Sequence, residues 1–171
     1  MSYQYVVTFI GDDRTGIVGQ LSATIEKHGG NWLESQLSQL GGKFAGLILI
    51  ELESEEASAL EADLANLPGG QWSVRVTPTN AAAITGEANL SLELVGPDRP
   101  GIVREVSTAL AETGINVVTM ESGVESAPFT GEPMFKASIS AHVPESVSTA
   151  ELSAKLDVIA EAMTLDIDLG Q

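Results

Sequence analysis

The chain of 171 residues contains no cysteine, which excludes disulfides, thiolate nucleophiles and cysteine-ligated metal centres. Basic residues are also scarce: 8 Lys and Arg stand against 24 Asp and Glu, for a net charge of −16. Because phosphate backbones are bound by clustered Lys and Arg, we expect no direct contact with nucleic acid. No apolar run approaches the ~18–20 residues of a membrane span. No basic leader precedes the first strand-like run, so we expect a cytoplasmic protein without membrane contact.

Side chains that commonly act as catalysts are few. The two histidines are His28, predicted at a helix C-terminus where an imidazolium is favourable, and His142, predicted on the solvent side of a strand. The spacings typical of zinc proteases, nucleophile elbows and phosphate-binding loops are absent. A pair of carboxylates flanking a substrate is set by the fold, and the sequence leaves it open. We therefore predict no catalytic residue, no metal and no cofactor, and the protein is not expected to be an enzyme.

An internal repeat dominates what the sequence does contain. The segment Gly11-Asp12-Asp13-Arg14-Thr15-Gly16-Ile17-Val18 recurs 85 residues later as Gly96-Pro97-Asp98-Arg99-Pro100-Gly101-Ile102-Val103. At the same offset Asn31 matches Asn116, each shortly after a glycine that is typical of a helix end. The period exceeds the roughly 20–50 residues of a solenoid unit, so it predicts a duplicated domain. We assign domain 1 to residues 1–78, a linker to 79–87 and domain 2 to 88–171.

Both repeats show the same order of hydrophobic periods, in which alternation indicates strands and spacings of three and four indicate helices. Repeat 1 predicts strands at 5–10, 31–40, 44–52 and 72–76, a helix at 15–28, and a second helix that begins with Ser54 as its N-cap. Repeat 2 predicts strands at 89–96, 115–124, 135–143 and 165–169, a helix at 100–113, and a second helix capped by Ser148. The order β-α-β-β-α-β predicts an α+β fold of two tandem ferredoxin-like units, each an antiparallel four-stranded sheet with helices on one face.

The start of each first helix is a candidate binding site. Free amides and the helix dipole favour a carboxylate there without any basic side chain. Pro100 suits the first helical position, Gly101 allows close approach, and the amide oxygens of Asn31 and Asn116 can accept from an ammonium group. The candidate ligand-binding residues are Asp13, Arg14, Thr15, Gly16, Ile17 and Asn31 in repeat 1, and Asp98, Arg99, Pro100, Gly101, Ile102 and Asn116 in repeat 2.

Simpler roles stay open for several of these residues. Asp13 and Asp98 could act only as partners of a helix N-terminus, and the two arginines could pair with nearby carboxylates. The two asparagines could serve turn chemistry alone. Their recurrence at one offset favours a shared explanation.

The duplicated Asp-Arg-x-Gly-Ile-Val motif, with Asn following the next glycine, resembles the ACT domain, a small ligand-binding regulatory module. More narrowly, the segments 31–44, 127–135 and 141–144 resemble the glycine cleavage system transcriptional repressor family, whose members are tandem ACT proteins of about this size. The resemblance implies that ACT domains pair side by side and bind a small amino acid, such as glycine, at the seam. Uncovered edge strands also favour pairing, so we expect a homodimer.

The same resemblance implies a function in regulation. The protein would modulate transcription of glycine cleavage through a partner, a DNA-binding transcription activator, because this chain has no basic reading helix. The alternative is an ACT protein that controls an enzyme of amino-acid metabolism without a role in transcription. Co-purification would distinguish the two by identifying the partner.

Overall fold

The computed structural model describes residues 1–79 and 86–170 and divides into two compact units, Met1–Ala82 and Ala83–Gln171. Most of the linker predicted at 79–87 lies outside the described residues. In unit 1 the elements are β1 (Ser2–Asp12), α1 (Ile17–Lys27), β2 (Asn31–Leu40), β3 (Lys43–Glu53), the short 3₁₀ helix η1 (Ser54–Glu56), α2 (Ala57–Ala65) and β4 (Ser73–Pro78). In unit 2 they are β5 (Leu90–Pro97), α3 (Ile102–Glu112), β6 (Asn116–Ser126), β7 (Pro133–His142), α4 (Thr149–Met163) and β8 (Asp166–Gly170).

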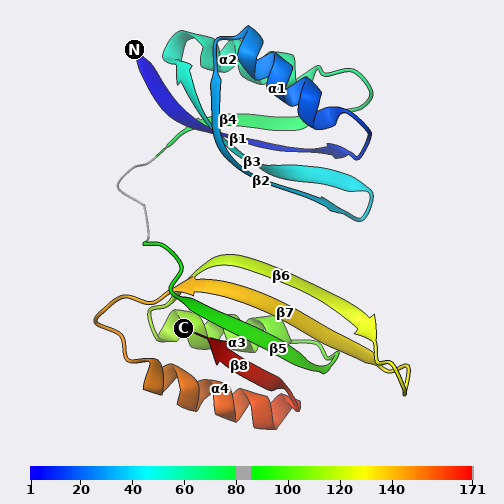
Figure 1. Ribbon diagram of the computed structural model, residues 1–171, viewed down its shortest axis with the longest axis vertical. Helices are drawn as coiled ribbons and strands as arrows, with labels where there is room; N and C mark the ends of the chain where they lie inside the picture. Colours follow the sequence, from blue (N-terminus) through cyan, green and yellow to red (C-terminus); the bar gives the residue numbers. More distant parts are fainter. Residues whose placement is uncertain (80–85, 171) are drawn as a thin grey trace. The chain divides into compact units, whose positions relative to one another are not determined.

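The two units repeat one topology, as the sequence predicts. Their sheets have the strand orders β2-β3-β1-β4 and β6-β7-β5-β8, and every described pairing is antiparallel. Figure 1 shows α1 and α2 on one face of the first sheet, and α3 and α4 on one face of the second. The predicted α+β fold of tandem β-α-β-β-α-β units is confirmed.

Each unit has its own core between sheet and helices. Alternate residues of the central strands turn inward, such as Val7 on β1 and Leu92 on β5, which are both fully buried. They meet Leu21 of α1 and Val106 of α3. The predicted apolar helix faces were too wide by one residue in each unit, because Val18 and Val103 are 43% and 44% exposed.

The second helices start differently in the two units. Ser148 caps α4 as predicted, since its side chain accepts a hydrogen bond from the Ala150 amide at 3.3 Å. Ser54 does not cap α2, which is a correction. It opens η1 instead, and α2 follows only from Ala57 without a side-chain cap. Two consecutive glutamates after Ser54 fitted a helix N-terminus in the sequence, but here they lie in the tighter 3₁₀ turn.

A histidine joins the two helices of unit 1. His28 follows α1 as its C-cap, and its side chain is only 11% exposed. Its Nδ1 lies 2.8 Å from Glu56 Oε2, and its Nε2 lies 3.0 Å from Asp63 Oδ2. With a carboxylate at each nitrogen, both nitrogens are donors only in the imidazolium form. The predicted C-terminal position of His28 is confirmed, and its carboxylate partners on η1 and α2 are new.

This cluster makes the stability of unit 1 depend on pH. The hydrogen bonds from His28 to Glu56 and then to Asp63 raise the pKa of His28 above its usual 6.5, and the bonds from Lys27 and His28 lower the pKa of Asp63 below 3.8. A raised histidine pKa contributes stability that is complete below pH 6.5 and is lost as the pH rises through the folded-state pKa. The Asp63 contribution is present above pH 3.8 and is lost on acidification.

We therefore expect unit 1 to lose stability as the pH rises above about 6.5, in chemical denaturation followed by circular dichroism. His28→Gln should flatten this slope, because glutamine carries no titrating charge. His142→Gln is the control, since the His142 ring faces the Glu87 carbonyl at 2.8 Å and takes no part in the cluster. An unchanged slope in His28→Gln would contradict the assignment.

Candidate functional site

The two loops that precede α1 and α3 have the same geometry. Gly16 and Gly101 are the N-caps of these helices and have left-handed backbones, with φ of 86° and 98°. The helices therefore begin at Ile17 and Ile102. The prediction of Pro100 at the first helical position is wrong, because Pro100 lies before the cap. The cap has a positive φ, which glycine adopts and proline cannot, so the helix begins after Gly101.

The two cap glycines are needed for their conformation. A Cβ at Gly16 would meet no atom within 4 Å, and a Cβ at Gly101 would approach only Arg104 Nη2 at 3.8 Å and Met163 Cε at 3.9 Å. Space around both positions is therefore ample. An L-residue at such a φ is strained, and this strain is the reason for glycine. The close approach of a ligand to the Gly101 backbone stays a prediction.

Close approach occurs instead at the glycines that begin the repeated motif. A Cβ on Gly11 would overlap the ring of Trp72 at atom Cε3. A Cβ on Gly96 would lie 2.6 Å from Leu165 Cδ2. Trp72 and Leu165, each just before the last strand of its unit, thus fix the backbone from which the loop departs. Sequence reasoning missed both, and the only signal was the glycine at the strand end.

Each loop is anchored at its first residue by the neighbouring hairpin. The Asp13 amide donates to the Gly42 carbonyl at 3.0 Å, and the Asp98 amide donates to the Pro133 carbonyl at 2.9 Å. The carboxylates of Asp13 and Asp98 are exposed, and no side chain of the described residues caps α1 or α3. The simple role of Asp13 and Asp98 as helix caps is therefore wrong.

The first amides of both helices thus have no capping side chain. Gly16 and Gly101 supply the first helical carbonyls, which accept from Gln20 at 3.1 Å and Glu105 at 2.9 Å. The side chains of Ile17 and Ile102 are buried in the two cores, so only their backbone can meet a ligand. What the loops offer is a pair of uncapped, positively polarised helix ends.

The two arginines of the motif differ. Arg14 donates through Nη2 to Gln20 Oε1 and to the Pro68 carbonyl, so it reaches the loop between α2 and β4. Its Nε is buried and has no hydrogen-bond partner among the described residues. Arg99 is exposed, and so is Thr15, the neighbour of Arg14. The arginine of unit 2 is therefore exposed to solvent, whereas Arg14 links its loop to the loop between α2 and β4.

The two asparagines lie far from the loops of their own units. Asn31 opens β2 and pairs with Glu51, which pairs in turn with Gln4 near the start of β1. The loop departs from Asp12, eight residues further along β1, so about 27 Å of strand separates it from the Asn31 row. Asn116 likewise opens β6 and pairs with His142 at the far end of β7. Within one unit, the predicted asparagine and loop are not brought together.

Both outer strands that begin with asparagine carry a bulge at the same point. The pairing shifts between Trp32 and Glu34 on β2, and between Val117 and Thr119 on β6. The bulged residues Leu33 and Val118 are 42% and 43% exposed. Bulges redirect side chains and often lie beside functional sites. The alternation of apolar and polar residues along the sequence did not reveal these bulges, because one extra residue only weakens that alternation.

Other kinds of site find no support in the part of the chain that the structure describes. Across residues 1–79 and 86–170 no group of three His, Asp or Glu side chains could hold a metal ion. None of the helices formed by these residues is long and apolar enough to cross a membrane.

Comparison with known proteins identifies the fold by sequence. The ACT domain model matches residues 4–71, and a second ACT domain model matches residues 90–158. A crystal structure of an unknown protein from Galdieria sulphuraria is 29% identical, with a TM-score of 0.87 over 99% of this chain and 98% of that one. A crystal structure of a "putative glycine cleavage system transcriptional repressor" is 20% identical, with a TM-score of 0.72 over 99% and 97%, and is similar in fold.

A curated relative adds a match to part of the chain. The UPF0237 protein YjhC of Lactococcus lactis subsp. lactis (strain IL1403) is 32% identical over 59 residues, which cover 34% of this chain and 68% of YjhC. The two ACT matches fall one in each unit and share the β-α-β-β-α-β order described above. The chain belongs to the ACT domain family and carries two ACT domains in tandem.

Proposed function

We propose that this protein is a ligand-sensing regulator that binds a small amino acid, glycine or a close analogue, at a seam between paired ACT domains. ACT domains are regulatory modules, which makes regulation the coarse function of the chain. The observation that carries the finer proposal is the duplicated loop with a left-handed glycine and an uncapped helix start. Such a start favours the carboxylate of an amino acid.

The strand directions explain why pairing is needed. Asn31 and the 13–17 loop lie at opposite ends of their sheet, and the same holds for Asn116 and the 98–102 loop. When two outer strands pair antiparallel, the start of one lies beside the end of the other. The asparagine of one domain then approaches the loop end of its neighbour. The helix amides would bind the carboxylate, and the asparagine would accept from the ammonium.

The downstream effect is proposed by analogy. The similar fold described as a glycine cleavage system transcriptional repressor supports a role in transcription of amino-acid metabolism. A chain with a net charge of −16 is suited to act through a protein, and we propose a DNA-binding transcription activator as its cytoplasmic partner. Recovery of an enzyme of amino-acid metabolism instead, by co-purification from cells, would favour control of that enzyme.

Calorimetry with glycine, serine and alanine tests the ligand proposal on the full chain. We expect at least one of these to bind, and Asn116→Ala or Asn31→Ala to weaken binding by about tenfold to hundredfold, since the ammonium loses an acceptor worth roughly 1–3 kcal/mol.

Asn66→Ala is the matched control, because Asn66 is an exposed asparagine after α2 whose side chain donates to the Ala62 carbonyl of its own helix. The Asn66→Ala variant should bind the amino acid with the same affinity as the wild type. If no small amino acid binds at millimolar concentration, or if all three variants bind alike, the proposed site is wrong.

A further inference from the structure

The sheet of unit 1 carries apolar side chains on the face turned away from its helices. Val6 lies opposite Leu49 in the β1–β3 ladder, and Ile10 follows on the same side and is 47% exposed. Leu47 lies between them on β3 and is 48% exposed. Val6, Leu47 and Leu49, with residues of β2, line a shallow hollow of about 210 Å³. We name Val6, Ile10, Leu47 and Leu49 together the apolar face of unit 1.

The corresponding face of unit 2 is more polar, although Val95 of β5, at the position that corresponds to Ile10, is 38% exposed on it. In the β5–β7 ladder Ser91 lies opposite Ser140, and Glu93 lies opposite Ser138. Ser138 Oγ donates to Glu93 Oε1 at 2.6 Å, and Asp168 lies beside Glu93 on β8. Both sheets share strand order, and their central ladders pair corresponding residues, so the two faces can be compared position by position. One repeat thus keeps a face suited to water, whereas the other exposes a contiguous apolar patch that marks an interaction surface.

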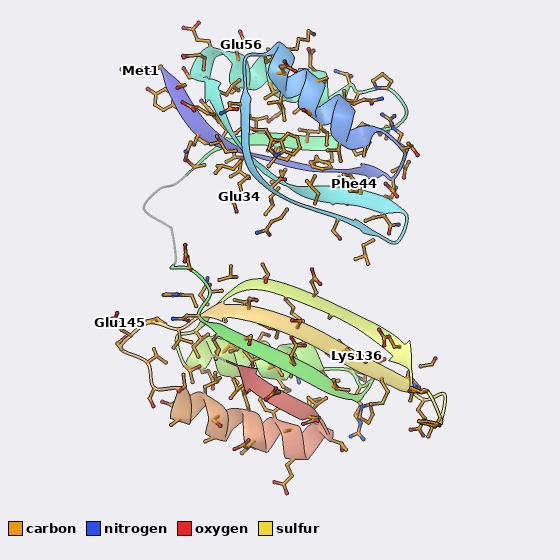
Figure 2. All side chains as sticks on the ribbon, viewed as in Figure 1. Met1, Glu34, Phe44, Glu56, Lys136 and Glu145 are labelled. Atoms are coloured by element: carbon orange, nitrogen blue, oxygen red, sulfur yellow. The ribbon has the colours of Figure 1, made fainter. Side chains whose placement is uncertain are left out.

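Opposite charges flank the apolar face. Glu34 lies on the outer strand β2 opposite Leu49, and Figure 2 shows it on the side away from the helices. Arg75 lies on the other outer strand, β4, opposite Thr8. Its side chain is 79% exposed and only 3.7 Å from Glu61, a surface contact that contributes little. Arg75 is therefore available to a different carboxylate.

We propose that the apolar face of unit 1 binds the same face of a second copy of this chain, sheet against sheet, in a two-fold dimer. A two-fold axis parallel to the strands lays β2 of one sheet over β4 of the other. In that arrangement Glu34 of each copy approaches Arg75 of the other, so the charge pair forms two times by symmetry. The two apolar faces contact each other between these pairs. The net charge of −16 repels copies elsewhere, so this weakly charged face is where they can associate.

The size of the face limits its affinity. Four strands about 4.8 Å apart and eight residues long, at about 3.4 Å each, give a face of roughly 14 by 27 Å. This is below the ~800 Å² that each partner contributes to an interface of standard size. We expect a dimer that dissociates in the micromolar range. The contact uses a sheet face, whereas the ligand seam proposed above uses outer strands, so either proposal can fail without the other.

Sedimentation equilibrium of the full chain tests this contact between about 1 and about 200 μM, a range that spans the expected dissociation constant. Leu47→Glu should weaken association at least about a hundredfold and halve the mass of the assembly, because it places a charge at the centre of a buried apolar contact. Ser138→Glu is the matched control: it makes the same kind of change at the corresponding ladder position of unit 2 and should leave the mass unchanged. Circular dichroism verifies that both variants are folded.

Charge reversal gives an independent measure. Glu34→Arg and Arg75→Glu should each weaken the dimer about tenfold, and the double variant should restore it, which a general loss of stability would not do. A wild type that stays monomeric at every concentration overturns the proposal and assigns the face to another part of the chain or another protein. An unchanged mass in Leu47→Glu, or a halved mass in Ser138→Glu, overturns it as well.

Discussion

Gly11→Ala is expected to destabilise unit 1 by about 1–3 kcal/mol, although it adds a single methyl group. The new Cβ would overlap the ring of Trp72 at Cε3, and this ring is 6% exposed and packs against Phe9 with ring centroids 6.2 Å apart. Since neither ring can move without opening the core, β1 and β4 must separate locally. Urea unfolding followed by tryptophan fluorescence measures the loss.

Gly19→Ala is the matched control for that experiment. Gly19 lies inside α1, where a Cβ would meet no atom within 4 Å. The same substitution should there stabilise unit 1 by about 0.5–1 kcal/mol, because alanine loses less backbone entropy in a helix. Opposite signs for the two variants separate steric overlap from the general effect of replacing glycine. Two losses of equal size would refute the overlap.

Trp72→Ala is expected to cost more, about 3–5 kcal/mol, since it leaves a cavity beside Phe9 in a small core. Its combination with Gly11→Ala is more informative than either variant alone. In the double variant the methyl group added at position 11 occupies space that the indole has vacated, so the two losses should not add. We expect a coupling of about 1–3 kcal/mol in a double-mutant cycle measured by urea unfolding. Additive losses would show that Gly11 and Trp72 do not share this contact.

The fold could be predicted from the sequence because both copies of the duplicated domain show the same order of hydrophobic periods. Strands such as β2, at 31–40, were placed to the residue because Gly29-Gly30 and Gly41-Gly42 mark both ends. Two of the errors lie at helix starts. Ser54 and Pro100 have the right chemistry for a start, but η1 and the left-handed Gly101 shift the helices by a few residues. The backbone conformation before each helix decides the residue at which the helix begins, and the amino-acid composition does not reveal that conformation.

The candidate site was predictable only in part. The loops around Gly16 and Gly101 could be found because their motif is duplicated, and both prove to be uncapped helix starts. Arg14 looked equivalent to Arg99, yet it reaches the Pro68 carbonyl, a contact between residues 54 positions apart that no local pattern shows. The bulges at Leu33 and Val118 and the packing of Trp72 on Gly11 also depend on strand pairing. Such features follow from tertiary contacts.

The anchoring of the two loops has a practical consequence for engineering. The Asp13 amide donates to the carbonyl of Gly42, and the Asp98 amide donates to that of Pro133, each at the C-terminal end of a hairpin connection. The connection between β6 and β7 has six residues, 127–132, whereas Gly41 and Gly42 alone join β2 to β3, and Phe129 in the longer connection is fully exposed. The extra length therefore leaves the anchor unchanged. Position 129 can therefore carry a fluorophore or an affinity tag while the hydrogen bond from the Asp98 amide to the Pro133 carbonyl is kept.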